Sequence, residues 1–463
     1  MLAESVQMHT IPEPISPAER HGRLLKVLGV GFGLAVIIGN TIGAGIFRAP
    51  GEIAGHLPNV WFFLGVWVAG GLYALLGSIS IAELGAMLPR SGGQYIFARY
   101  ALGEYAGFIV GWSDWISTCG SIAAISIVIG EFADGLFPVL AGKSVAIAAT
   151  VAICFAILQW CGIVLGSQVQ NVTSLLKTLA FLVLIAAAFI FGGKGPADAP
   201  AAAVALATGP ALLVAVILSL QSVIYTYDGW TGVIYFSEEV KDPGRDIPRS
   251  MFGGVLLVIG IYLLVNLALV YVLPISKIAG QDFAAGVAAQ VIFGKYGDTI
   301  FRSLTILAMF SGVNANTLMA SRVLFAVSRD GLFSQHAATV NKVGTPTIAL
   351  FMSAVVALLF IVFAKTFAKV ISVLALFFVA NYTLSFISLF VLRHCEPDKP
   401  RPYRAWGYPF TTALALLGSV AFLIGAVASD LKSGSRDSIY AVLLLAASYP
   451  VFRVIGLLRT KEA

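Results

Sequence analysis

Charged residues are scarce in this sequence. Asp, Glu, Lys and Arg together make up 11% of the 463 residues, whereas a soluble domain usually contains about 25%. Hydrophobic residues make up 59%, and apolar runs recur along almost the whole chain. These proportions exclude a soluble globular protein, and they predict one continuous all-α polytopic membrane domain rather than several soluble domains.

Histidine and cysteine are also few. The histidines all fall in expected loops or tails, so we expect no buried metal cluster, no catalytic residue and no cofactor; they are His9, His21, His56, His336 and His394. Of the four cysteines, three lie inside apolar runs and Cys395 lies in a basic loop, which gives no disulfide framework. The chain is therefore not expected to be an enzyme.

Sequence signatures of nucleotide and nucleic-acid binding are missing as well. Gly142-Lys143-Ser144 lacks the first glycine of a Walker A loop, because Phe137 stands in its place. The net charge of +6 comes from basic residues in short loops, not from a basic patch interleaved with aromatic residues. An ATP-driven pump and a nucleic-acid partner are both excluded.

Apolar runs long enough to cross a bilayer are what the sequence does contain. A hydrocarbon core about 30 Å thick needs about 20 apolar residues per helix. Twelve runs meet this need, near residues 27–47, 61–82, 105–131, 145–165, 170–192, 210–236, 250–273, 300–325, 347–364, 368–392, 409–428 and 439–458. Residues 283–300 could form a further short helix before the eighth run.

The distribution of Lys and Arg predicts the orientation of these twelve transmembrane helices. With a cytoplasmic N-terminal tail at 1–22, the inner loops and tails carry about twice as many basic residues as the outer loops. Basic residues favour the cytoplasmic side. We therefore expect a multi-pass protein of the cell membrane with both termini in the cytoplasm and the lipid bilayer as its surroundings.

The first apolar run contains an unusual concentration of glycine. Gly39, Gly43 and Gly45 fall within seven residues, and glycine weakens a helix. Close helix packing through small residues would explain the spacing, but it would not explain the polar pair Asn40-Thr41 beside the glycines. We therefore expect a break in this helix.

The sixth run is interrupted too. Tyr225, Asp228 and Gly229 lie within an otherwise apolar stretch, and a carboxylate there costs a few kcal/mol unless it faces water or a partner. Interruptions at matching positions of two five-helix halves indicate a binding site between inverted repeats. The halves would be residues 23–200 and 201–395, followed by two further helices and a tail in 396–463.

Two broken helices side by side have a particular chemistry. An unwound turn exposes amide N–H groups at the N-terminus of a half-helix, where the positive end of the helix dipole attracts a carboxylate. The carbonyl groups freed on the opposing half-helix attract an ammonium. An α-amino acid carries both groups on one carbon, so it is the small molecule that this site is expected to bind.

The sequence resembles the amino acid–polyamine–organocation superfamily, and within it the L-type amino acid transporter group and its bacterial relatives. The resemblance extends from the first run to about the tenth. Its marks are Ile42-Gly43-Ala44-Gly45-Ile46-Phe47, Leu88-Pro89-Arg90-Ser91-Gly92-Gly93-Gln94-Tyr95, Tyr227-Asp228-Gly229-Trp230, Glu238-Glu239-Val240-Lys241-Asp242-Pro243, Asn314-Ala315-Asn316 and Ser328-Arg329-Asp330-Gly331.

This resemblance implies the leucine-transporter fold, with 5+5 inverted repeats and the substrate held at the breaks of helices 1 and 6. It implies that amides around Gly43, Ala44 and Gly45 hold the carboxylate. The residues implied for the ammonium and the gate are Thr41, Ile42, Tyr225, Asp228 and Gly229. Ala44 stands where many relatives have serine, and residues 132–144 lack the cysteine that links some relatives to an accessory chain.

Several polar residues inside expected helices have open roles. Lys177 lies roughly 13 Å along the fifth helix if that helix starts near residue 168; the resemblance implies that such a lysine replaces a bound cation in sodium-independent relatives. Asp114 could be a structural partner of a hydroxyl or amide, a counter-ion of Lys177 or a substrate-site carboxylate. Asn314 and Asn316 could line the pathway or bond between helices, and Asp228 suits neutral and dibasic substrates alike.

Acidic and basic residues at the expected inner helix ends leave a further question open. Glu83, Arg90, Glu238 and Glu239 could form a gate network, or they could serve as helix caps and topology signals. The sequence thus predicts a sodium-independent secondary transporter of amino acids that works by exchange or by uptake coupled to protons. A membrane receptor that senses amino acids on the same fold remains the alternative.

Overall fold

The computed structural model describes residues 24–43, 45–192, 206–364, 367–433 and 437–462. The tail expected at 1–22 and the expected site residue Ala44 lie outside these ranges. Throughout the described part the secondary structure is helical, apart from one isolated bridge between Leu28 and Val240.

The chain order and bounds of the helices are as follows. In order they are α1 (Val30–Thr41), α2 (Gly45–His56), α3 (Val60–Met87), α4 (Gln94–Leu102), α5 (Glu104–Leu136), η2 (Pro138–Leu140), α6 (Ser144–Trp160), α7 (Ile163–Phe191), α8 (Pro210–Tyr227), η3 (Gly232–Phe236), α9 (Pro243–Val272), α10 (Ile275–Ile278), α11 (Ala284–Phe293), η4 (Gly294–Tyr296), α12 (Gly297–Arg329), η5 (Gln335–Ala338), α13 (Thr347–Ala364), α14 (Phe367–Cys395), α15 (Phe410–Ser433) and α16 (Asp437–Glu462).

Ten helical stretches in the described residues are long and apolar enough to cross a membrane, or eleven if α1 and α2 count as one bent span. Each of the twelve expected runs has a helix in the structure, but α6 has only 17 residues and falls below that length. The chain is therefore an all-helical multi-pass membrane protein. The short helix expected within 283–300 is present as α11.

Local sequence signals set several helix starts. Asn59 caps α3, because its side-chain oxygen accepts from the amides of Trp61 and Phe62 at 3.0 and 3.3 Å. Pro210 and Pro243 open α8 and α9, where a missing amide hydrogen costs nothing. α9 thus begins in a polar stretch seven residues before the start expected from hydropathy, because proline and not apolarity sets the boundary.

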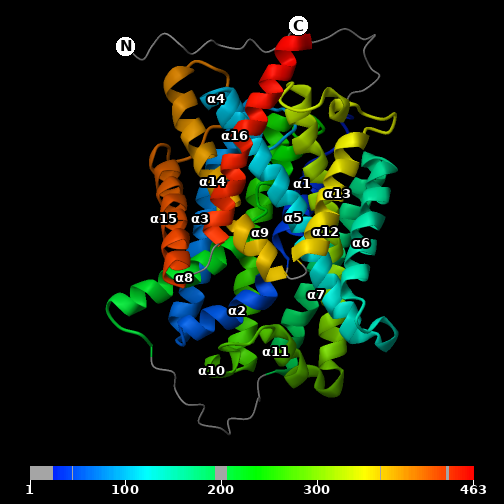
Figure 1. Cartoon of the computed structure of the whole chain (residues 1–463). Helices are drawn as coiled ribbons and strands as arrows, with labels where there is room; N and C mark the ends of the chain where they lie inside the picture. Colours follow the sequence, from blue (N-terminus) through cyan, green and yellow to red (C-terminus); the bar gives the residue numbers. More distant parts are fainter. Residues whose placement is uncertain (1–23, 44, 193–205, 365–366, 434–436, 463) are drawn as a thin grey trace.

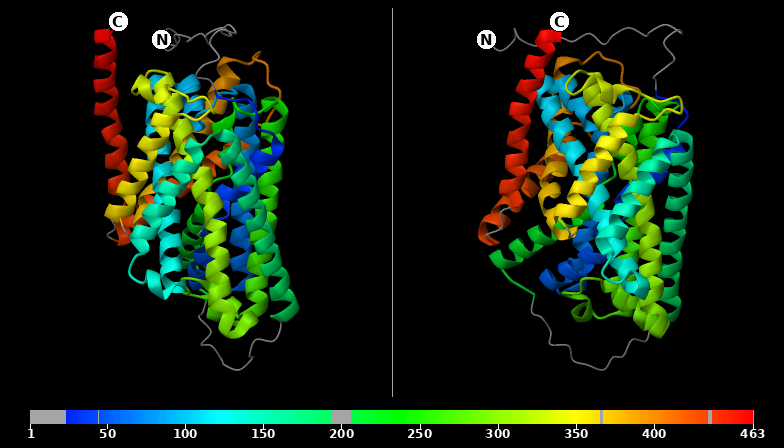
Figure 2. Two further views of the ribbon diagram at one scale, coloured as in Figure 1. Left: turned by 90° about the vertical axis from the view of Figure 1, so that its right-hand side faces the viewer. Right: turned by 45° about the vertical axis from the view of Figure 1, so that its right-hand side comes forward.

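The helices form one bundle in which α5 and α12 are central (Figure 1). In their most apolar windows 89% of α5 and 72% of α12 is buried by protein, whereas α16 is only 11% buried. α16 runs along the outside of the bundle (Figure 2). Its C-terminal end lies at the opposite end of the molecule from α10 and α11 (Figure 1).

Backbone pairing ties the two interrupted segments together at one end. The amide of Leu28, just before α1, donates to the carbonyl of Glu239 at 2.8 Å, and the amide of Lys241 donates to the carbonyl of Leu28 at 2.8 Å. Glu239 and Lys241 follow η3. The segments that lead into α1 and out of η3 therefore lie side by side.

Candidate functional site

The first apolar run is broken as its glycines predict. α1 ends at Thr41, α2 begins at Gly45, and the two helices are bent by 45°. A side chain on Gly43 would come no closer than 3.9 Å to another heavy atom, whereas one on Gly45 would meet Thr226 Oγ1 at 2.9 Å. Gly43 therefore borders open space, and Gly45 allows α2 to contact α8.

The sixth run breaks beside the first one. α8 ends at Tyr227, and Gly229 follows with a φ of 107°, a conformation that side chains rarely adopt. A Cβ on Gly229 would also lie 2.9 Å from the amide nitrogen of Thr41 and 2.8 Å from the side chain of Asn40. Glycine at this position lets the two breaks come into backbone contact.

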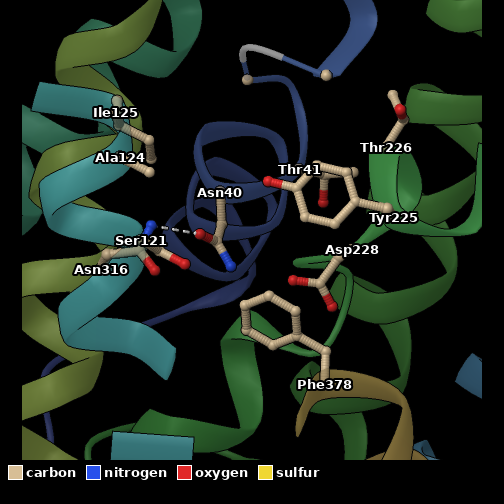
Figure 3. A pocket seen from close by; sticks show the side chains of 12 residues that line it. Asn40, Thr41, Ser121, Ala124, Ile125, Tyr225, Thr226, Asp228, Asn316 and Phe378 are labelled. Carbon is tan, nitrogen blue, oxygen red and sulfur yellow. Dashed lines mark hydrogen bonds between the residues drawn. The ribbon is translucent and has the colours of Figure 1, made fainter. Parts of the chain in front are cut away.

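A cavity lies between the breaks. Its lining comes from α1, α2, α5, α8, α12 and α14 and comprises Asn40, Thr41, Gly43, Gly45, Ser121, Ala124, Ile125, Tyr225, Thr226, Asp228, Asn316 and Phe378. Figure 3 shows Tyr225 and Thr41 on one side and Asp228 above Phe378 on another. Among the expected site residues, Thr41, Gly43, Gly45, Tyr225 and Asp228 line it, while Ile42 and Gly229 shape the turns behind it.

Of the polar residues that α5 and α12 contribute to the lining, Ser121 was not an expected site residue, whereas Asn316 was expected either to line the pathway or to bond between helices. Asn316 donates to the side chain of Asn40 at 2.7 Å, and Ser121 lies beside them (Figure 3). Asn316 was noted in the sequence, but its pairing with Asn40 joins positions 276 residues apart. Ser121 and Phe378 carry no local signal, because each lies in an ordinary apolar run.

Lys177 is fully buried on α7 and binds the end of α1 where the first break begins. Its Nζ donates to the carbonyl of Gly39 at 2.9 Å and to the carbonyl of Ile42 at 2.5 Å. Ser174, three residues earlier on the same face, donates to the carbonyl of Ala35 at 2.7 Å. α7 thus binds the end of α1 through the side chains of Lys177 and Ser174, which donate to backbone carbonyl groups there.

Two hydroxyl groups of α12 donate to carbonyl groups of their own helix and not to the first break. Ser311 donates to the carbonyl of Ala308, and Thr317 donates to the carbonyl of Val313.

Tyr262 of α9 holds the carbonyl groups of both breaks. Its hydroxyl lies 2.7 Å from the carbonyl oxygen of Thr41 and 3.0 Å from that of Thr226, so one donor is shared between the ends of α1 and α8. Its ring is fully buried and packs edge-on against Trp67. Nothing in the sequence marks this tyrosine, because it lies within a long apolar helix.

Asp228 at the second break has partners inside the protein. Its Oδ1 accepts a hydrogen bond from the hydroxyl of Tyr382 on α14, and the backbone of Gly229 also hydrogen-bonds its carboxylate. The ring of Tyr382 stacks on Trp230 with centroids 4.8 Å apart. Asp228 therefore lines the cavity and also fixes the turn that forms it.

Asp114 and Asn314 lie outside the cavity. Asp114 accepts from the hydroxyl of Tyr235 at 2.9 Å, which matches a structural partner and not a counter-ion of Lys177. Asn314 donates to Gln170 at 2.8 Å and to the carbonyl of Gly166 at 3.1 Å. The contacts of Asn314 are thus interhelical hydrogen bonds, and a role for it in the pathway stays a prediction.

A cluster of ion pairs lies at the end of the bundle where α12 ends. Arg322 of α12 binds Glu239 through two hydrogen bonds of 3.0 and 3.1 Å, and both side chains are buried. Burial raises the pKa of Glu239, and the guanidinium of Arg322 opposes that shift. Arg329 pairs with Glu238 at 2.6 Å in the same way. Both acids follow η3, so these pairs connect the second broken span to α12.

The other two residues singled out at helix ends are also paired. Arg90 contacts Asp330 at 2.9 Å. Glu83 is fully buried and accepts from Arg393 at 2.7 Å and from the amide of Ala405 at 2.6 Å. The four residues therefore form interhelical ion pairs rather than helix caps.

No site for a metal is found within the ranges that the structure describes. There, no group of three or more His, Cys, Asp or Glu side chains could hold an ion. The chemistry that the cavity offers is therefore that of amides, carbonyl groups, hydroxyls and one carboxylate.

Comparison with known proteins agrees with this geometry. The sequence model of the amino acid permease family matches residues 33–448, which include both breaks, Lys177 and Tyr262. The chain belongs to this family. It is therefore an amino acid transporter and not an enzyme.

Several curated proteins are similar to this permease along most of its length. The serine/threonine exchanger SteT of Bacillus subtilis is 29% identical over 93% of this chain and 96% of its own length. The Asc-type amino acid transporter 1 of Mus musculus is 28% identical over 82% of this chain and 73% of its own length. The human large neutral amino acids transporter small subunit 2 is 29% identical over 82% of this chain and 72% of its own length.

Proposed function

We propose that this permease is a sodium-independent exchanger of neutral amino acids that works by alternating access. The observation that carries the proposal is the position of Lys177, whose side-chain nitrogen donates to one carbonyl group in the last turn of α1 and to one directly after it, where the first break begins. A cation at that place stabilises carbonyl groups that the helix no longer satisfies. With this charge supplied by the protein, the break needs no bound sodium.

The amino acid would bind with its two charged ends at the two breaks. The first amides of α2 have no partner within the helix, so the turn at Gly43–Gly45 suits the carboxylate. Thr41, Ile42, Tyr225 and Asp228 would serve the ammonium. The carbonyl oxygens of Thr41 and Ile42 already accept one hydrogen bond each, and each retains a second lone pair.

The contacts of Asp228 favour neutral substrates. Its carboxylate is held by Tyr382 and by the backbone of Gly229, so it belongs to the turn and not to a free acidic pocket. Ser121, Asn316 and Ile125 form a lining of mixed polarity opposite the breaks. The names of the relatives, a serine/threonine exchanger and carriers of neutral amino acids, support the same substrate class and an exchange mode.

The finer architecture is part of this proposal. The membrane domain would have twelve spans of the leucine-transporter fold, with α1 and α2 as the first span and the 17-residue α6 as the fourth. Residues 23–200 and 201–395 would be the inverted halves, and 396–463 would add two peripheral spans. Both termini would lie in the cytoplasm of the cell, and no disulfide-linked accessory chain would be needed.

Ion pairs on either side of the cavity suggest how access alternates. Arg322–Glu239 and Arg329–Glu238 lie at the end of the bundle where α12 ends. Arg48 of α2 and Glu131 of α5 pair at 3.2 Å toward the opposite end. Opening the cavity to one side would separate the pairs on that side while those on the other side stay closed.

Flux into proteoliposomes tests the proposed function. Vesicles that contain the purified permease are loaded with unlabelled serine or left empty, and uptake of labelled serine is followed in choline buffer. Exchange predicts uptake into loaded vesicles and little into empty ones. Uptake that follows an imposed proton gradient in empty vesicles would indicate proton coupling instead, and binding without uptake would indicate an amino acid sensor.

A further inference from the structure

A second cavity lies between α2, α7, α9 and α11. Every side chain that lines it is apolar. Phe47 of α2, Phe181 and Ala188 of α7, Ala268 of α9 and Ala288 of α11 form its walls. It is separate from the amino acid cavity, since the two share no lining residue. No function assigned so far uses it.

The cavity borders the elements that hold the first break. Phe47 and Phe181 stack with centroids 5.4 Å apart and planes at 25°, which joins α2 to α7. Phe181 lies four residues after Lys177 and therefore on the same face of α7. Phe181 therefore connects the lining of the cavity to Lys177 along one face of α7. A ligand in the cavity would contact Phe47 and Phe181 and would affect the position of α2.

The surroundings of the cavity are the lipid-facing sides of α7 and α9. Leu182 and Val183 of α7 are 43% and 65% exposed, and Leu264 and Leu267 of α9 are each 40% exposed. In membrane-spanning helices such apolar surface faces hydrocarbon. Leu184 and Ile292 of the lining are half-buried, which places them at its rim.

A polar ligand does not fit this chemistry. Its hydrogen-bonding groups would have no partner among the lining side chains, and burying such groups without partners is costly. A hydrocarbon chain that enters from the bilayer loses nothing on transfer, because it leaves an equally apolar medium. It gains van der Waals contacts with side chains that otherwise border empty space.

We propose that an acyl chain of a membrane phospholipid occupies this cavity and stabilises the packing of α2 against α7. The inference is independent of the substrate and of the exchange mode proposed above. It makes the rigidity of the first broken span dependent on the lipid that surrounds the protein.

Photolabelling of the full chain in nanodiscs tests the proposal. The probe is a phosphatidylcholine with a diazirine on one acyl chain, and adducts are located by peptide mass spectrometry. We expect adducts on the buried lining, such as Ala188 and Ala288, at a level above that of the exposed residues of α15 and α16. Adducts that simply follow exposure around the bundle would show surrounding lipid only and would overturn the proposal.

Variants that fill the cavity sharpen the test. Ala188→Phe and Ala268→Phe place a ring in the space, and Ala186→Phe places the same ring on an exposed position of α7. Labelling of Leu184 and Ile292 should fall about tenfold in the filled variants, which corresponds to about 1.4 kcal/mol, and should stay unchanged in Ala186→Phe. Equal labelling in all three would overturn the proposal. If the filled variants do not fold, the labelling map of the unmodified protein decides the question.

Discussion

The hydroxyl of Tyr262 lies 2.7 Å from the carbonyl oxygen of Thr41, at the point where the first span loses its helix. The same hydroxyl reaches the carbonyl of Thr226, so one side chain of α9 connects both broken spans. A buried carbonyl group that loses its donor carries a desolvation penalty. Tyr262 is therefore a residue that fixes the shape of the proposed amino acid site without lining it.

Replacing this tyrosine should weaken binding while the ring packing is kept. In Tyr262→Phe the aromatic contacts with Trp67 remain and only the donor is lost. We expect amino acid affinity to fall by about 1–3 kcal/mol, measured by scintillation proximity binding on purified protein. Tyr271→Phe, at a half-exposed tyrosine on the same helix, is the control. Unchanged affinity in Tyr262→Phe would show that the shared hydrogen bond does not shape the site.

A side chain on Gly43 should block the carboxylate position. Because a Cβ there would meet no neighbouring atom within 3.9 Å, valine fits the fold but occupies cavity space. We expect Gly43→Val to lower affinity by about 100-fold, or about 2.8 kcal/mol, with monodisperse protein.

The structure separates this test from one at Gly45, where a side chain would clash with Thr226 and disturb the packing of α2. Gly260→Val, at another open glycine of a membrane helix, is the matched control. Full affinity in Gly43→Val would contradict carboxylate binding at this turn.

Loss of the negative charge at Asp228 should affect all substrates alike. Asp228→Asn disturbs the turn held by Tyr382 and Gly229, so uptake of two different neutral amino acids, serine and leucine, should decrease by the same factor, which corresponds to about 1–3 kcal/mol in transport efficiency. Tyr382→Phe should reproduce the effect in part. A loss confined to dibasic substrates would instead make Asp228 their direct counter-ion and would remove the argument for neutral substrates.

The proposed orientation can be tested with single cysteines. Cys395 ends α14 and is exposed, and Val139 in η2 is 83% exposed. In intact cells a membrane-impermeant maleimide should label Val139→Cys in a background without other cysteines. It should label a variant that keeps Cys395 alone only after the cells are opened. The opposite pattern would invert the topology.

The sequence predicted the breaks better than it predicted the cavity. Glycine spacing and an intramembrane carboxylate are local signals, and they located the ends of α1 and α8 correctly. Ser121, Asn316 and Phe378 reach the cavity only because α5, α12 and α14 pack around the breaks. Such contacts depend on helix rotation, which the uniform apolar character of these spans does not reveal.

Helix rotation also explains why Asn314 lies outside the cavity, and the role of Tyr262 could not be predicted for a similar reason. Asn314 and Asn316 are two positions apart and therefore face different sides of α12, so one bonds to Gln170 and the other reaches the cavity. Tyr262 resembles any buried aromatic residue until its hydroxyl is seen between two carbonyl groups. Lys177 was found because a charge inside a membrane helix is rare.

The most direct test of the account is the sodium dependence of initial uptake, compared between the unmodified permease and Lys177→Ala in proteoliposomes. Because the ammonium of Lys177 already holds the carbonyl groups of Gly39 and Ile42, uptake by the unmodified protein should be the same in sodium and choline buffers. Lys177→Ala should lose most of it, and Lys177→Arg should retain little. A strict sodium requirement in the unmodified protein, or full activity of the alanine variant, would contradict the mechanism.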